Sequence, residues 1–161
     1  MASFGSPPAA PRDPLALRIA YGIGAAGLLG ATAADTLAVA GRHTGLNLLG
    51  SIEIVQAAVV LLAAAAMFAV TVRAGHAGVH FLVARARPQT AAGLVRLAAL
   101  LSAIAFLLVA AGSAWVMIEL WPGHEQTELL HIPIKWLRLV WTVFAVLIAG
   151  LFLRTALGRQ P

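Results

Sequence analysis

Four long apolar blocks limit what this chain can fold into. Each exceeds the roughly 20 helical residues that cross the hydrocarbon core of a bilayer. The blocks are continuous and rich in Ala and Leu, and they lack the alternation typical of a membrane barrel strand. The sequence therefore predicts an all-α membrane protein with four transmembrane helices, near residues 15–40, 47–72, 94–121 and 133–156.

Composition argues against a soluble fold. Hydrophobic residues make up 61% of the chain and charged residues 11%, whereas about a quarter of an ordinary soluble domain is charged. A soluble bundle helix shows a polar stripe, and the run VVLLAAAAMFAVTV at 59–72 has none. The net charge of +5 is scattered over the connections, so no nucleic-acid-binding domain is expected. The absence of Cys excludes disulfides and thiolate metal sites.

The chain outside the spans is short. Residues 1–14 are expected to form an irregular N-terminal tail, 15–156 the transmembrane domain and 157–161 a C-terminal tail. In the second connection, HAGVHFLVARARP at 76–88, Val79, Leu82 and Val83 share one helical face, with basic residues nearby and Pro88 ending the run. This pattern predicts a short amphipathic helix in the headgroup layer between the second and third spans. An ordinary basic loop is the alternative.

The Lys and Arg residues predict how the chain sits in the membrane. Eight lie in the tails and the second connection or close to them, and three lie near the first and third connections. The positive-inside rule therefore places both termini in the cytoplasm. The eight are Arg12, Arg18, Arg73, Arg85, Arg87, Arg96, Arg154 and Arg159, and the three are Arg42, Lys135 and Arg138.

Three acidic residues fall within or at the ends of the spans. Asp35, Glu53 and Glu119 gather toward the leaflet that also holds Arg42, and Asp35 precedes Arg42 by seven residues, so one helical face can carry both. Intramembrane charges indicate either an ion pathway or ion pairs that tie helices or subunits together. A pathway also needs polar groups at the midplane and the inner leaflet, where the sequence has none. Structural pairing is therefore the favoured interpretation.

The histidines raise the question of a metal site. In HEQTELLH at 124–131, His124, Glu128 and His131 have a spacing that brings three ligands together on a helix. The segment is not the H-E-x-x-H zinc motif, and the nearby Pro122 and Pro133 limit continuous helix. His76 is expected at the membrane surface. No serine has a neighbouring base, so no catalytic, cofactor-binding or metal-binding residue is predicted.

At this level of detail the sequence resembles a known family, the small permease (DctQ-like) subunit of tripartite ATP-independent periplasmic, or TRAP, transporters. The resemblance covers about residues 15–156. In that family an Arg at the end of the first helix precedes an acidic residue early in the second, and Arg42 and Glu53 hold this relation across GRHTGLNLLGSIE. GHAGVH at 75–80 and TELLHIP at 127–133 match two later family segments.

The chain also departs from the family pattern. Ile54 replaces a second acidic residue, and no Trp precedes Glu53. Ala77 replaces the usual Ile, and His80 stands where Asp is common. These differences indicate a divergent branch and weaken any transfer of a role to His80.

The resemblance implies transport without catalysis. In TRAP systems a soluble periplasmic protein captures the substrate, often a carboxylate or sialic acid. A large multi-helix subunit then moves it inward by an elevator-like motion driven by a sodium gradient. The small subunit is similar to a brace on the static scaffold of the large one, with a further expected role in docking the binding protein.

For this chain the resemblance implies a small, non-enzymatic membrane subunit of a sodium-coupled symporter in the bacterial inner membrane. Its expected partners are the large permease subunit, the periplasmic substrate-binding protein and membrane lipid, with no cofactor and no nucleic acid. Arg42, Glu53, Asp35 and His76 are expected to make partner or inter-helix contacts. The alternative is a free-standing small membrane protein, either a metal-dependent membrane enzyme that uses the HEQTELLH segment or a proton channel.

Overall fold

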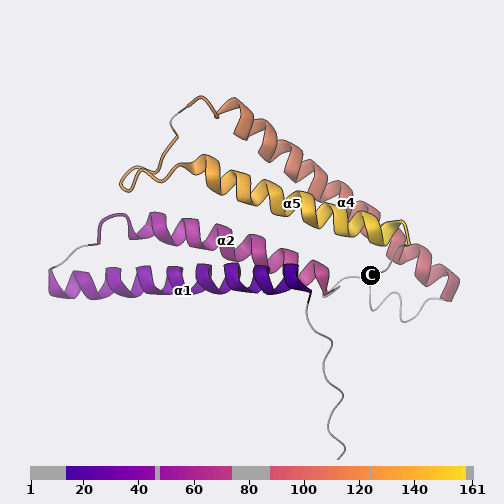
Figure 1. The fold of residues 1–161 in the computed structure, drawn as a ribbon, viewed down its shortest axis with the longest axis horizontal. Coiled ribbons are helices and arrows are strands. Elements are labelled where there is room, and N and C mark those ends of the chain that lie inside the picture. The colour runs from indigo at the N-terminus through magenta and orange to yellow at the C-terminus, as the bar shows by residue number, and fades with distance from the viewer. Residues whose placement is uncertain (1–13, 46–47, 74–87, 124, 159–161) are drawn as a thin grey trace, which may run out of the picture.

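The structure, a computed structural model, describes residues 14–45, 48–73, 88–123 and 125–158. Within these ranges it consists of helices α1 (Leu15–Thr44), α2 (Ser51–Val72), α4 (Pro88–Glu119) and α5 (Ile134–Ala156), labelled as in Figure 1. Each of the four is long and apolar enough to cross a membrane. The predicted all-α fold with four spans is therefore confirmed. The predicted amphipathic helix, with His76 and His80, lies in residues 76–87, outside the described residues.

Glycine and proline set most helix ends, and they shift the predicted spans by up to about two turns. Gly45 ends α1 in the left-handed conformation at a φ of 80°, so Arg42 lies in the last helical turn, where a cation suits the helix dipole. Gly50, with a φ of 82°, precedes α2. Pro88 begins α4, because a proline needs no backbone N–H in the first turn of a helix.

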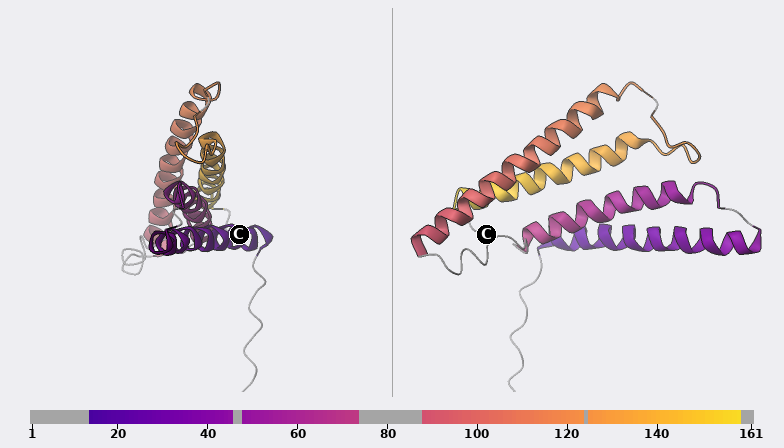
Figure 2. Two further views of the ribbon diagram at one scale, coloured as in Figure 1. Left: turned by 90° about the vertical axis from the view of Figure 1, so that its left-hand side faces the viewer. Right: turned by 180° about the vertical axis from the view of Figure 1, so that it is seen from behind.

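The helices form an open array in the order α1, α2, α5, α4. Among the described residues, α1 packs on α2, α2 on α5, and α5 on α4, and no other pair of helices is in substantial contact. The α1–α2 and α4–α5 hairpins lie closest together where α1 begins and α5 ends, and they diverge toward the other end (Figures 1 and 2). We call that other end, which carries the 45–50 and 120–133 connections, the hairpin end.

Small residues bring α1 and α2 into close contact. Ala20, Gly24 and Gly27 of α1 are buried, as are Ala58 and Ala65 of α2. A Cβ placed on Gly27 would lie 2.7 Å from the carbonyl oxygen of Ala58 and 3.0 Å from the backbone nitrogen of Leu62. Small residues are what allow two helix backbones to approach in a membrane, so Gly27 sets the α1–α2 distance.

Gly27→Ala is therefore expected to force the first hairpin apart. The atoms that the added methyl group meets belong to the backbone and cannot rotate away. Overpacking of this kind costs about 1–3 kcal/mol, and the better helix propensity of Ala offsets about 1 kcal/mol. We expect a lower thermal unfolding midpoint in detergent. Gly22→Ala is the matched control, because a Cβ there meets nothing within 4 Å, and an equal midpoint for the two variants would contradict the prediction.

The buried core lies away from the hairpin end. Ala20, Ala65, Phe68 and Ile148 form a cluster that joins α1, α2 and α5. Aromatic contacts extend it, with ring centroids 5.7 Å apart for Phe68 and Phe144 and 5.9 Å apart for Phe106 of α4 and Phe152 of α5. Within the described residues, this buried cluster therefore joins the two hairpins at the end away from the hairpin end.

Most of the apolar surface points outward. Between 17% and 28% of the most apolar stretch of each span is buried within the described residues. Leu29 and Leu108, for example, are each 69% exposed. Such a surface must be covered by lipid or by another membrane protein.

Candidate functional site: a clamp at the hairpin end

The connection between α4 and α5 folds back on itself as a compact turn. Gln126 and Pro133 form an isolated antiparallel bridge, and the Ile134 N–H donates to the carbonyl of Glu125 at 3.2 Å. Inside the turn, the hydroxyl oxygen of Thr127 accepts the N–H of Ile132 at 3.0 Å. These bonds leave the N–H groups at the tip of the turn available to a group outside it.

Glu53 supplies that group. It lies in the first turn of α2, and its two carboxylate oxygens accept the backbone N–H groups of Leu129 and Leu130, each at 2.8 Å. Hydrogen bonds to a charged acceptor are short and stronger than neutral ones. Leu129 and Leu130 are 76 and 77 residues from Glu53 in sequence. The contact therefore ties the α4–α5 hairpin to the start of α2. We call it the Glu53 clamp.

Gly50 provides a seat for the same turn. A Cβ built on Gly50 would lie 2.6 Å from Cγ of Leu130, so the Leu130 side chain rests directly on the Gly50 backbone. Gly50 also has a φ of 82°, a conformation that residues with a Cβ rarely adopt. Glycine is therefore required here both by backbone conformation and by the contact with Leu130.

Comparing Gly50→Ala with Gly45→Ala separates the two requirements. Both glycines have a positive φ, but a Cβ on Gly45 meets nothing within 4 Å. We expect Gly45→Ala to cost about 1 kcal/mol from backbone strain alone. Gly50→Ala should lower the thermal midpoint further, because it also displaces Leu130. Equal losses in the two variants would show that the Leu130 contact contributes nothing.

An ion pair and a ring cluster complete the hairpin end. Arg138 of α5 lies 3.3 Å from the carboxylate of Glu125, with side chains 30% and 40% exposed. A pair this exposed contributes little stability, but it orients the connection. The rings of Trp121 and Trp136 meet edge to face with centroids 6.4 Å apart, and Lys135 lies 5.4 Å from the Trp121 ring. Aromatic and basic residues of this kind gather at membrane interfaces.

The other residues expected to make contacts have different surroundings. Asp35 and Arg42 are both exposed on α1, and neither side chain has a hydrogen bond or an ion pair with any residue in the described ranges. Among the described residues no ion pair joins Arg42 to Glu53, and the end of α1 extends past the start of α2 (Figure 1). His76 lies outside the described residues. Roles for Asp35, Arg42 and His76 stay predictions.

The segment considered for a metal site is not helical where the structure describes it. Residues 125–133 form turns and a bridge, and His131 has a φ of 55°, so helical spacing does not apply to Glu128 and His131. Among the described residues no three His, Asp or Glu side chains are placed to hold a metal ion. His124 lies outside that part of the chain.

Comparison with known proteins identifies the family. A family model described as "Tripartite ATP-independent periplasmic transporters, DctQ component" matches residues 31–160. The chain belongs to this family. DctQ proteins are components of TRAP transporters and work with the other TRAP components. The four apolar helices make this member a multi-pass membrane protein. No match was found among curated proteins. No solved structure matches either.

The Glu53 clamp joins two segments that carried the resemblance to DctQ. Sequence reasoning treated Glu53 and TELLHIP at 127–133 as separate markers, but the carboxylate accepts its hydrogen bonds from N–H groups within that segment. The roles of Thr127, Leu130 and Gly50 were missed. Every residue type except proline has a backbone N–H, so the sequence does not reveal which residues donate to Glu53. The one hint in the sequence was Gly50, directly before a helix whose first turn contains an acidic residue.

Proposed function

We propose that this chain is the small membrane (Q) subunit of a TRAP-type, sodium-gradient-driven uptake transporter. In this role it is a non-catalytic scaffold for the large permease subunit, which carries the substrate and the coupling ion. Membership in the DctQ family is the observation that carries the proposal. The open helix array supports it, because four helices in a row offer a broad surface to a neighbour.

The distribution of polar groups supports a brace rather than a pathway. Among the described residues Ser51 alone is a buried polar residue, and it lies at the hairpin end. The hydroxyls of Thr71, Thr142 and Thr155 donate to carbonyls one turn earlier in their own helices. A solute or ion path needs polar groups across the midplane, whereas these hydroxyls are turned back on their own backbones.

The proposal includes an orientation. With both termini in the cytoplasm of a bacterial cell, the hairpin end faces the periplasm. The Glu53 clamp then fixes a turn on the side from which a substrate-binding protein delivers its ligand. Arg42 and Asp35 are the proposed partner contacts on α1, since both are exposed.

Purification in mild detergent tests the proposed function. The chain, tagged at one end and expressed in its native bacterial host, should co-purify in stoichiometric amounts with a much larger multi-helix membrane protein identified by mass. Metal analysis of the same sample addresses the enzyme alternative. Recovery of the chain alone, or with a bound metal ion, would contradict the proposal.

A further inference from the structure

The turn between α4 and α5 is closed by hydrogen bonds that do not involve Glu53. Thr127 and Ile132 are paired in both directions, because the Thr127 N–H donates to the Ile132 carbonyl at 3.1 Å and the Ile132 N–H donates to the Thr127 hydroxyl oxygen at 3.0 Å. The N–H of His131 donates to the carbonyl of Thr127 at 3.2 Å. These bonds hold the turn in shape without a contribution from α2.

Three donors of this turn converge on one carboxylate. The backbone nitrogens of Leu129 and Leu130 lie 2.8 Å from the two oxygens of Glu53, one each. The hydroxyl of Thr127 donates to the same carboxylate, because an ionised carboxylate only accepts. The imidazole of His131 is near enough to interact with its charge. Successive N–H groups in a turn form a concave site for an anion, and this turn adds a hydroxyl to them.

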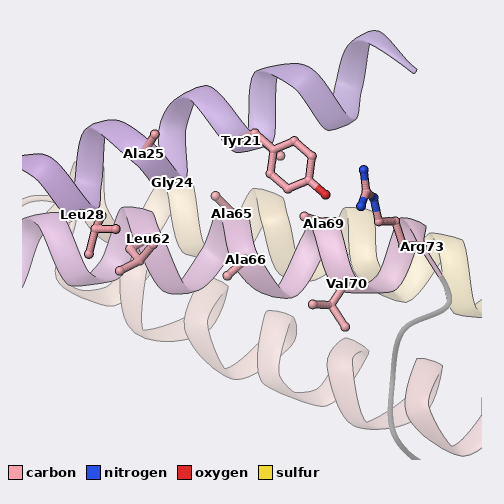
Figure 3. Close-up of a pocket in the computed structure, with 11 residues that line it drawn as sticks. Tyr21, Gly24, Ala25, Leu28, Leu62, Ala65, Ala66, Ala69, Val70 and Arg73 are labelled. Atoms are coloured by element: carbon pink, nitrogen blue, oxygen red, sulfur yellow. The ribbon is translucent and has the colours of Figure 1, made fainter. Parts of the chain in front are cut away.

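The carboxylate borders a hollow at the hairpin end. The hollow has a volume of about 640 Å³, and Glu53, Thr127 and Leu129 are among the residues that line it. The donors of the turn therefore lie next to a space that is large enough for a small solute. By contrast, the groove of about 660 Å³ between α1 and α2 (Figure 3) is lined mainly by apolar residues such as Ala65 and Ala69, and that lining does not define a ligand.

We infer that the turn at 125–133 is a preformed binding site for one carboxylate group, with Glu53 as its resident ligand. The donors recognise two oxygens and a negative charge, which any carboxylate supplies. A free small carboxylate such as acetate therefore binds to the same donors when Glu53 is shortened to Ala. This chain forms the site by itself, so the inference goes beyond the proposed function and does not rest on it.

Hydrogen exchange with added acetate tests the inference on the purified full chain at neutral pH. Glu53→Ala removes one methylene and one carboxylate group, and acetate supplies the same atoms. In about 0.5 M sodium acetate, peptides from 125–133 of Glu53→Ala should exchange about threefold more slowly than in sodium chloride of equal concentration, the protection given by a ligand at about twice its dissociation constant. Unchanged exchange of these peptides in acetate would overturn the inference.

Two controls separate binding from a solvent effect. Acetamide has the shape of acetate but has no charge and only one acceptor oxygen, so it should give no protection. The wild-type chain should exchange equally in acetate and in chloride, because Glu53 already occupies the site at a high effective concentration. Equal slowing by acetamide, or equal slowing of the wild-type chain by acetate, would overturn the inference.

Substitutions of Thr127 in the Glu53→Ala chain test the third donor. Thr127→Ser keeps the hydroxyl, so acetate should still protect peptides from 125–133. Thr127→Val removes the hydroxyl at nearly constant side-chain size, so acetate should give little or no protection. Thr142→Val is the control and should keep the protection, because the hydroxyl of Thr142 donates within its own helix to the carbonyl of Arg138. Equal protection in Thr127→Val and Thr127→Ser, or its loss in both, would overturn the three-donor site.

Discussion

Replacing Glu53 with Ala is expected to release the turn at residues 125–133 from the first hairpin. The N–H groups of Leu129 and Leu130 lose their carboxylate acceptor. Among the described residues, neither N–H group donates to a backbone carbonyl. The hairpins diverge toward this end (Figure 1), and the buried cluster of described residues that joins them, with Phe68 and Ile148, lies away from it. The effect should be local, with the helices still formed.

Hydrogen exchange measured by mass spectrometry reports this release directly. Peptides that cover 125–133 should exchange about tenfold faster in Glu53→Ala than in the wild-type chain, because two hydrogen bonds that close the segment are lost. Glu53→Gln should give part of the effect, since an amide offers one acceptor oxygen in place of two. Glu119→Ala is the control, an exposed acidic residue at the end of α4. Unchanged protection in Glu53→Ala would show that the clamp does not hold the turn.

Ile148→Ala is expected to give the largest loss of global stability. Ile148 is 1% exposed, and it belongs to the cluster that joins α5 to α1 and α2. Removing a buried Ile side chain costs about 2–5 kcal/mol in soluble cores. In a membrane protein the lower end, about 2 kcal/mol, is expected, because lipid is as apolar as the core and only packing contacts are lost.

Unfolding by SDS titration, followed by the tryptophan signal, measures this loss. Leu147→Ala is a matched control, because Leu147 directly precedes Ile148 on α5 and its side chain is 48% exposed. The control should unfold close to the wild-type midpoint, whereas Ile148→Ala should unfold at a clearly lower SDS fraction. If both variants shift equally, Ile148 does not hold the two hairpins together.

The four spans were predictable because the bilayer demands long apolar stretches and the sequence contains four. Their ends were less so. Arg42 and His43 are polar, yet they continue α1, which ends only where Gly45 takes the left-handed conformation. The predicted third span began at residue 94 because the residues before it, PQTAAG at 88–93, are less apolar than the rest of a helix that starts at Pro88. Hydropathy locates the lipid-crossing part of a helix, and backbone conformation decides where the helix ends.

The clamp shows where sequence reasoning falls short. Glu53 was singled out as an acidic residue early in a span, but the sequence offered only cations as partners. In the structure its partners are backbone N–H groups, and any residue type supplies such a group. The order of the helices across the array, with α2 rather than α1 beside α5, was equally beyond prediction, because all four helices have apolar residues on every side.

In the proposed function this chain holds a neighbouring subunit and passes no solute itself. Flux measured in proteoliposomes tests it most directly. Vesicles that contain the purified chain alone should show no uptake under an inward sodium gradient and no proton leak above that of empty vesicles. Vesicles that contain the chain with its large subunit, supplied with the binding protein and its ligand, should show sodium-dependent uptake. Sodium-driven uptake or proton conduction by the chain alone would contradict the proposed function.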